Sequence, residues 1–285
     1  MRVHLDCIPC FQRQALDAAR FITDDEKMHE NIIRAVIAEL QGMDWKKSPP
    51  EIAHVVHKII RDESGVEDPY KDVKKYYNDI TLKMYPELKK TVNNSATPLL
   101  TAVRLAIAGN VIDFGAKSDF DLNETISLVL KKDFKIYHFS EFVRSLEKAN
   151  NILYLADNAG EIVFDRILLE TIFKEYNVEK TLFALKGAPI INDATYEDAK
   201  YVGINNLKGL EFIKVGVGIP GTGIERTSNE FQDVILKSDI VISKGQGNYE
   251  ALSELRGIFF LLMAKCPVIA EDLGVKVGDI ILKGG

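Results

Sequence analysis

The stretch that decides the fold reads NILYLADNAGEIVFDRILLETIFKEY and covers residues 151–176. Its first part, Ile152 to Ala156, is a short apolar run with the length of a buried strand. A polar turn from Asp157 to Gly160 follows, and from Ile162 to Tyr176 the apolar residues recur with helical spacing. The stretch therefore predicts a strand, a loop and a helix in direct succession.

The same alternation continues toward the C-terminus. Further apolar runs of strand length occur at residues 180–185, 210–215, 240–243, 258–263, 267–270 and 280–282. Helical patterns follow the first three of these runs, at residues 195–201, 225–236 and from 249 onward. Strands that alternate with helices are joined by right-handed crossovers and lie parallel in one sheet. We therefore expect an α/β fold with a parallel sheet.

The segment before residue 150 has a different pattern. From Cys10 to about Asn150 the apolar residues recur at spacings of three and four, which is typical of helices. Turn signals that open helices occur at residues 48–50, 68–69 and 93–98. We expect a mostly helical region at residues 1–148 and an α/β, Rossmann-like domain at residues 149–285 that carries the functional site.

Composition and charge exclude several classes of function. The chain has 285 residues, 46% of them hydrophobic, which is enough for one large core or two modest ones. Its net charge of -6 is spread along the chain without a Lys/Arg block, so we expect no nucleic-acid partner. No apolar run approaches the roughly 18 residues of a membrane span, and the N-terminus lacks a signal-peptide pattern. We therefore expect a cytoplasmic protein with no membrane partner, and a homo-oligomer is left open.

Polar residues gather at three of the expected strand ends. The segments are DNAGE at residues 157–161, KGAPIIND at 186–193 and SKGQGN at 243–248. Ligands of open parallel sheets bind just beyond the carboxyl ends of the strands. Two acids, two amides, two lysines and several glycines would therefore converge on one rim.

The oxygen-rich side chains of this rim favour a divalent ion such as Mg or Mn. Carboxylate and amide oxygens are hard ligands, and the absence of a nearby histidine or cysteine disfavours a catalytic zinc site. The alternative is that Asp157 and Asp193 only cap the helices that follow them. Because Asn158, Glu161 and Lys244 belong to the same polar strand ends, we favour the divalent-ion site.

The candidates for substrate binding are Lys244, Asn110, Asp113 and Asn248. Lys244 lies in Lys-Gly-x-Gly-Asn, where flanking glycines let the backbone approach a ligand and the ammonium can meet a phosphate. A solvated loop lysine is the alternative, and Lys186 is a weaker candidate. Asn248 ends the same motif. Asn110 and Asp113 lie three apart among apolar residues and either bond within the core or line the pocket.

A glycine-rich loop matches the dinucleotide fingerprint without its context. Residues 216–221 read G-x-G-x-x-G after an expected strand. Pro220 prolongs the loop where a helix should run, and Asp239 precedes its strand instead of ending it. We therefore do not expect a dinucleotide there.

The cysteines are three in number, which argues against a secreted disulfide framework. Cys7 and Cys10 have the spacing of a metal or redox pair. A zinc set that adds Cys266 and His4 is one interpretation, and a packing or accessory role is the other.

Taken together, five ordered motifs resemble the damage-control phosphatase family, formerly a domain of unknown function, in its archaeal-type branch with an N-terminal CxxC. The motifs lie at residues 7–10, 108–113, 157–161, 186–193 and 238–248. The resemblance implies a three-layer α/β/α core with a mostly parallel sheet, preceded by a helical N-terminal region. It also implies one divalent ion (Mg, Mn, Co or Ni) held at the positions of Asp157, Asn158 and Asp193, and a phosphate-contacting lysine at Lys244.

The function that follows is a metal-dependent phosphatase. Its partners would be small phosphorylated metabolites such as sugar phosphates and phosphopantetheine-like compounds. Asp157, Asp193, Lys244 and Glu161 are the candidate catalytic residues, and Glu161 or Asp113 would orient the attacking water. A covalent aspartyl-phosphate route is disfavoured, because the haloacid-dehalogenase pattern places an Asp where this chain has Ala159.

Two other classes of function stay open from the sequence. One is a nucleotide-cofactor enzyme, such as an S-adenosylmethionine-dependent carboxyl methyltransferase, that uses the loop at residues 216–223. The other is a thiol or metal-binding module without catalysis that uses Cys7 and Cys10.

Overall fold

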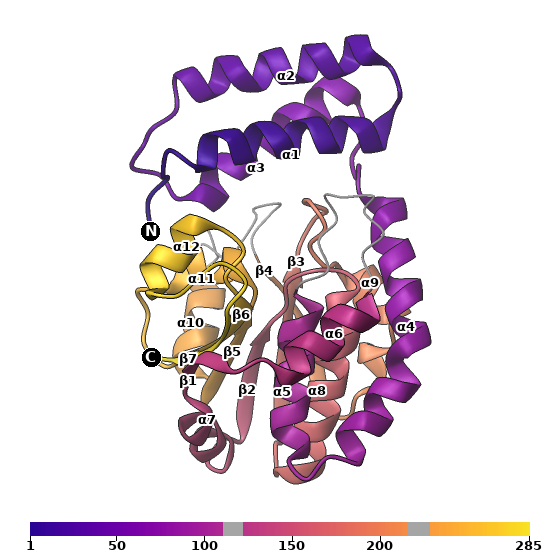
Figure 1. Cartoon of the computed structure of the whole chain (residues 1–285), viewed down its shortest axis with the longest axis vertical. Helices are drawn as coiled ribbons and strands as arrows, with labels where there is room; N and C mark the ends of the chain where they lie inside the picture. Colours follow the sequence, from indigo (N-terminus) through magenta and orange to yellow (C-terminus); the bar gives the residue numbers. More distant parts are fainter. Residues whose placement is uncertain (111–121, 216–228) are drawn as a thin grey trace.

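The computed structural model describes residues 1–110, 122–215 and 229–285 and shows one sheet between two helical layers (Figure 1). The seven strands have the order β1-β7-β6-β5-β2-β3-β4. All neighbouring pairs are parallel except β6 and β7. The expected α/β/α class, with a mostly parallel sheet and a helical N-terminal region, is confirmed. The strands are β1 (Phe134–Tyr137), β2 (Asn151–Leu155), β3 (Lys180–Lys186), β4 (Leu210–Val215), β5 (Ile240–Lys244), β6 (Ile258–Met263) and β7 (Ile280–Gly284).

The helices fall into three groups. The N-terminal bundle is α1 (Cys7–Ile22), α2 (Glu26–Gln41) and α3 (Pro49–Ser64). One face of the sheet carries α4 (Lys71–Asn93), α5 (Pro98–Gly109), α6 (Leu122–Lys131), α7 (Phe139–Leu146), α8 (Glu161–Glu175), α9 (Tyr196–Tyr201) and the short η1 (Ile204–Asn206). The opposite face carries α10 (Asn229–Lys237), α11 (Gln246–Leu252) and α12 (Pro267–Leu273).

The central strand β2 feeds both hydrophobic cores, because successive side chains of a strand point to opposite faces. Ile152 and Tyr154 belong to the core under α5 and α8, whereas Leu153 and Leu155 belong to the core under α11 and α12. All four side chains are buried. This double burial explains why the stretch reads as a continuous apolar run instead of an alternating one.

The α1–α3 bundle has a core of its own and lies beyond one end of the sheet (Figure 1). Ile191, from the loop after β3, packs against that core. The bundle therefore covers the end of the sheet at which β3 finishes. The helix starts expected at Pro49 and Pro98 are confirmed, since both prolines occupy the first turns of their helices.

One expectation from the sequence is wrong. Residues 267–270 form no strand but the start of α12, where Pro267 opens the helix and Gly274 ends it in a left-handed conformation. The segment before residue 150 is mostly helical, as expected, and it also contains β1, which pairs with β7 at the edge of the sheet. A strand of four residues is too short to show a period of its own. The division at residues 148 and 149 stays a prediction, and the sheet takes one strand from upstream of it.

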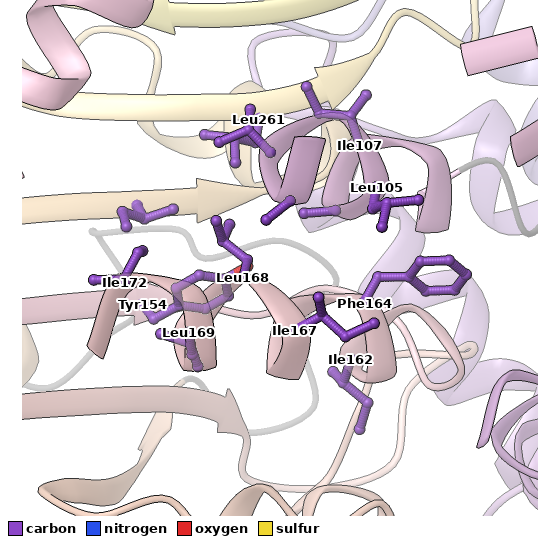
Figure 2. Packing of buried hydrophobic residues seen from close by; sticks show 14 of the residues in the cluster. Leu105, Ile107, Tyr154, Ile162, Phe164, Ile167, Leu168, Leu169, Ile172 and Leu261 are labelled. Carbon is purple, nitrogen blue, oxygen red and sulfur yellow. The ribbon is translucent and has the colours of Figure 1, made fainter. Parts of the chain in front are cut away.

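The α5–α8 contact fixes the layer that faces the site. Figure 2 shows Leu105 of α5 facing Phe164 of α8, Ile107 on the far side of α5, and Tyr154 of β2 beside Leu168 of α8. All five side chains are buried. Among the described residues, no helix has the length and apolarity needed to cross a membrane.

Leu168→Ala should lower the free energy of unfolding by about 2–5 kcal/mol, because it leaves a cavity in this packed layer. Leu168 has no exposed surface. Leu128 of α6 is 62% exposed, so Leu128→Ala is the matched control and should change stability little. Urea denaturation of both variants measures the difference. Equal stability losses would contradict the assignment of this layer as the core.

Candidate active site

The site lies where the order of the strands reverses. From β2 the chain continues outward through β3 and β4, and it then returns to pair β5 with the other side of β2. A crevice at such a switch point is where open α/β sheets bind ligands. The three polar segments expected from the sequence all leave this edge, directly after β2, β3 and β5.

Backbone hydrogen bonds join the loops after β2 and β3. Ala194 N donates to Asp157 O at 2.8 Å, and Ala159 N donates to Asn192 O at 2.9 Å. Between these bonds Asn158 and Asp193 form an isolated antiparallel bridge. The second loop therefore folds back onto the Asp157 loop, and these two polar segments meet at one rim as expected. The structure brings the three predicted metal ligands together, and their role as ligands stays a prediction.

Neither aspartate caps a helix. The residue before α8 is Gly160, and α9 begins with a capping box made by Thr195 and Asp198. The alternative in which Asp157 and Asp193 serve only as helix caps is therefore wrong.

Two asparagine amides hold the acids of the first loop. Asn110 Nδ2, at the end of α5, donates to Asp157 Oδ2 at 2.9 Å and to Glu161 Oε2 at 3.0 Å. Asn158 Nδ2 donates to the same two oxygens at 2.9 and 3.1 Å. Asn110 Oδ1 is buried and has no hydrogen-bond partner within the described part of the chain.

Lys244 ends β5 and has no exposed surface. Its Nζ donates to Asp165 Oδ1 at 2.7 Å, to Glu161 Oε1 at 2.5 Å and to the Ala106 carbonyl at 2.9 Å. A lysine ammonium has three donors, so all are used. Burial acts to lower the pKa of Lys244, but Asp165 and Glu161 outweigh it and hold the pKa above its usual value. A direct phosphate contact, as expected from the motif, would require breaking one of these bonds.

Asp165 is a member of the site that the sequence argument missed. It is fully buried on α8, one turn after Glu161. Burial raises the pKa of Asp165 to about 6, although the Lys244 ammonium acts in the opposite direction. The available signal was the spacing, because two acids four residues apart share one face of a helix that is otherwise largely apolar there.

The two carboxyl groups nearest the mouth of the site, those of Asp157 and Asp193, also have raised pKa values. Asp193 is buried, and its Oδ2 lies 3.5 Å from Lys186 Nζ. Burial raises the pKa of Asp193 to about 6 against the attraction of Lys186. Burial and the nearby Glu161 and Asp193 raise the pKa of Asp157 well above its usual value. Deprotonated carboxylates at this position therefore need an additional positive charge.

The charge of the whole group has a simple balance. When ionised, four carboxylates face the two buried lysines and leave two negative charges uncompensated, which is the charge that one divalent cation would neutralise. The carboxylates belong to Asp157, Glu161, Asp165 and Asp193, and the lysines are Lys186 and Lys244.

Gly245 lets the backbone after β5 lie directly against the Asp157 side chain. Its φ is +80°, and an added Cβ would lie 1.8 Å from Asp157 Oδ2. No side chain fits there without displacing the carboxylate. Next to it, Asn248 is 1% exposed and donates to the Ala156 carbonyl at 3.1 Å and the Lys244 carbonyl at 2.8 Å. Asn248 therefore ties β2 to β5, and its predicted contact with substrate is untested.

Lys265 is a second residue that the sequence argument missed. It follows β6, is exposed, and its charge acts to lower the pKa of Asp157. Its backbone N donates to Gln246 Oε1 at 3.0 Å, which fixes it beside the loop after β5. An unburied ammonium at this rim suits a phosphate better than Lys244 does.

Several predicted features do not come together or lie elsewhere. Asp113 and the glycine-rich loop at residues 216–223 lie outside the described residues. Burial raises the pKa of the Cys7 thiol, and the nearby Cys10 and Cys266 add to the rise, so the three cysteines lie close to one another. Even so, no three His, Cys, Asp or Glu side chains within residues 1–110, 122–215 and 229–285 are placed to hold a metal, so the zinc set that adds His4 is not formed. Cys7, Cys10 and Cys266 form no disulfide within the described residues.

The acidic site also lacks a ready metal cage of three carboxylates. Among the described residues, Asp157, Glu161 and Asp193 are not placed to hold an ion together. The predicted ligand set instead combines two carboxylates with the amide oxygen of Asn158. Such a set of hard oxygen donors fits Mg²⁺ or Mn²⁺, and it fits the uncompensated negative charge.

Comparison with known proteins decides the family. The profile of the damage-control phosphatase ARMT1-like domain matches residues 3–281. The chain belongs to this family. It is therefore a phosphatase, and the reaction at its active site is phosphoryl transfer to water. Whether it falls in the branch with an N-terminal CxxC stays a prediction.

Relatives of this damage-control phosphatase match along its whole length. A damage-control phosphatase of Pyrococcus horikoshii is 36% identical over 99% of this chain and 97% of its own. One from Archaeoglobus fulgidus is 33% identical over 99% of both chains. A crystal structure of a DUF89 family protein from Pyrococcus horikoshii superposes with a TM-score of 0.90 at 33% identity and covers 100% of this chain and 99% of that one.

Lys244→Met should destabilise this phosphatase by about 3–5 kcal/mol at pH 8, because it leaves buried carboxylates unpaired. The loss should shrink toward pH 5. The pKa of Asp165 is already raised to about 6 in the folded state, so its effect on stability worsens as the pH rises through that value. Without the Lys244 ammonium the pKa of Asp165 rises further, so the free energy of unfolding continues to fall up to a higher pH.

Urea denaturation of parent and variant between pH 5 and 8 measures this trend. Lys237→Met removes a lysine whose side chain is 76% exposed and should leave the whole profile unchanged. A Lys244→Met loss that is the same at every pH would contradict the ion cluster.

Proposed function

We propose that this phosphatase hydrolyses phosphate monoesters of small metabolites with one divalent metal ion. The proposal rests on one observation above all, the acidic group at the switch point that retains two uncompensated negative charges. A protein that buries such a group needs a cation to keep it ionised. The family assignment supplies the reaction class, and this charge supports the metal.

Asp157, Asn158 and Asp193 would hold the ion, which we infer to be Mg, Mn, Co or Ni. When bound, such an ion polarises a phosphoryl oxygen and lowers the pKa of a bound water. The backbone bonds between the two loops keep these three side chains at fixed positions. Fixed ligands reduce the reorganisation needed during reaction, which is where phosphoryl-transfer enzymes obtain most of their rate.

The remaining residues would divide into positioning and substrate contact. Glu161 has no exposed surface, so we assign it to holding the two amides and Lys244 in place. Lys244 would compensate the charges of Glu161 and Asp165 through its two ion pairs. Lys265 would meet the substrate phosphate as a point charge from the rim. Asp113 stays a candidate for orienting the water.

The substrate class follows from the relatives. Both curated relatives carry the name damage-control phosphatase. We therefore infer sugar phosphates and phosphopantetheine-like compounds as substrates, and a cytoplasmic location for the reaction. Hydrolysis of p-nitrophenyl phosphate with Mg²⁺, Mn²⁺, Co²⁺ or Ni²⁺, compared with EDTA, tests the metal requirement. Full activity in EDTA after dialysis would overturn the proposal.

Asp193→Asn should reduce Mn²⁺ affinity at least roughly tenfold and reduce turnover with it, because it removes one charged ligand while preserving shape. Calorimetric titration of Mn²⁺ into both proteins measures the affinity. Asp239→Asn is the matched control, since Asp239 accepts the backbone N–H groups of Asn150 and Asn151 at the opposite end of β2. Unchanged affinity in Asp193→Asn would remove Asp193 from the ligand set.

Lys265→Ala should lower kcat/KM roughly ten- to hundredfold, mainly through KM, because a charge-assisted contact with the phosphate is lost. Metal affinity should stay within twofold of the parent. Steady-state kinetics at saturating Mn²⁺ checks the first statement, and calorimetry checks the second. A parental KM would show that Lys265 does not touch the substrate.

A further inference from the structure

A buried asparagine on α4 bonds to the turn after β2 and to the first turn of α9. Asn78 is 1% exposed. Its Oδ1 accepts the N–H of Gly160 at 2.6 Å, and its Nδ2 donates to Asp198 Oδ1 at 2.9 Å. These partners lie 82 and 120 residues away in sequence. One side chain of the helical region therefore connects the turn that carries Asn158 with the helix that follows the Asp193 loop.

The first contact fixes the turn after β2. Gly160 stands between Asn158 and Glu161 and has φ +74°. An added Cβ at Gly160 would lie 3.0 Å from Tyr77 Cβ, so α4 packs directly against this turn. The Gly160 N–H lies at the start of α8, where backbone donors lack partners within the helix. Asn78 supplies the partner and thereby sets the direction in which the turn presents Asn158.

The second contact fixes the end of the loop after β3. Asp198 Oδ2 accepts the N–H and the hydroxyl of Thr195 at 3.0 and 2.7 Å. Thr195 follows Asp193 by two residues. Lys74, also on α4 and buried, lies 3.7 Å from Asp198 and 2.7 Å from Asp68. Asp198, in the first turn of α9, is therefore held by Asn78 and Lys74 of α4 and by Thr195.

We propose that Asn78 is a positioning residue of the active site, which holds the Asp157–Asn158 turn in a fixed orientation against the start of α9 and so supports the backbone bonds between the two loops. This inference rests on the proposed function. The side chain must accept one hydrogen bond and donate another at the same time, in opposite directions. An amide does both, whereas a carboxylate only accepts and an aliphatic side chain does neither.

The neighbouring Thr81 separates positioning from simple packing. Thr81 has no exposed surface and lies one turn after Asn78 on the same helix. Within the described part of the chain, its hydroxyl bonds to the carbonyls of Tyr77 and Asn78 in its own helix. Thr81→Ala therefore disturbs the interior of α4 without removing a hydrogen bond to either loop.

The test compares Asn78→Ala, Asn78→Asp and Thr81→Ala with the parent in three measurements. They are Mn²⁺ affinity by calorimetry, hydrogen exchange of the Gly160 amide by NMR without metal, and hydrolysis of p-nitrophenyl phosphate at low and saturating Mn²⁺. Substitution of groups that orient metal ligands typically lowers affinity ten- to hundredfold. We expect Asn78→Ala to lose affinity by roughly that factor and to exchange the Gly160 amide faster, with activity partly rescued by saturating Mn²⁺.

Asn78→Asp keeps the acceptor for Gly160 and loses the donor to Asp198, so we expect slow Gly160 exchange with reduced Mn²⁺ affinity. Thr81→Ala should match the parent in all three measurements, even where its urea denaturation midpoint falls. Parental affinity in both Asn78 variants, or equal losses in Thr81→Ala, would overturn the positioning role. A parent that neither binds Mn²⁺ nor hydrolyses the ester would instead overturn the proposed function, and parental Gly160 exchange in Asn78→Ala would then still overturn the role of Asn78.

Discussion

The buried ion cluster around Lys244 is the interaction on which the site depends. It joins the end of β5 to two acids of α8 and to a carbonyl of α5, so three separate elements meet at one ammonium group. Burying one charge alone is costly, and the cluster is stable only when every member is present. Glu161 in turn holds the amides of Asn110 and Asn158. The positions of the outer acids therefore follow from the inner cluster.

The acids divide into an inner and an outer set with different surroundings. Glu161 and Asp165 have their ammonium partner and are closed off from solvent. Asp157 is partly exposed at the mouth, and Asp193 has Lys186 at a longer distance. Because both outer pKa values are raised, the outer set favours a proton or an added cation. This asymmetry is the physical basis for placing a divalent ion between the two loops.

The helical region takes part in the site as well as in the fold. Asn110 from α5 and Asn78 from α4 reach the loops of the sheet. Without them the Gly160 N–H would lose its side-chain acceptor, and Asp157 and Glu161 would each lose one of their amide donors. The two regions predicted from the sequence therefore share one polar network at their contact.

The sequence by itself determined the strand-loop-helix units, the polar strand ends and the family, because these depend on neighbouring residues and on ordered motifs. The local pattern could not show that residues 134–137 form an edge strand or that 267–270 form a helix, since both segments are very short. Only the tertiary structure decided that Lys244 faces inward, that Asp165 and Asn78 complete the network and that Lys265 lies at the rim. Their partners lie tens of residues away or more, and the orientation of a side chain relative to such partners is set by packing.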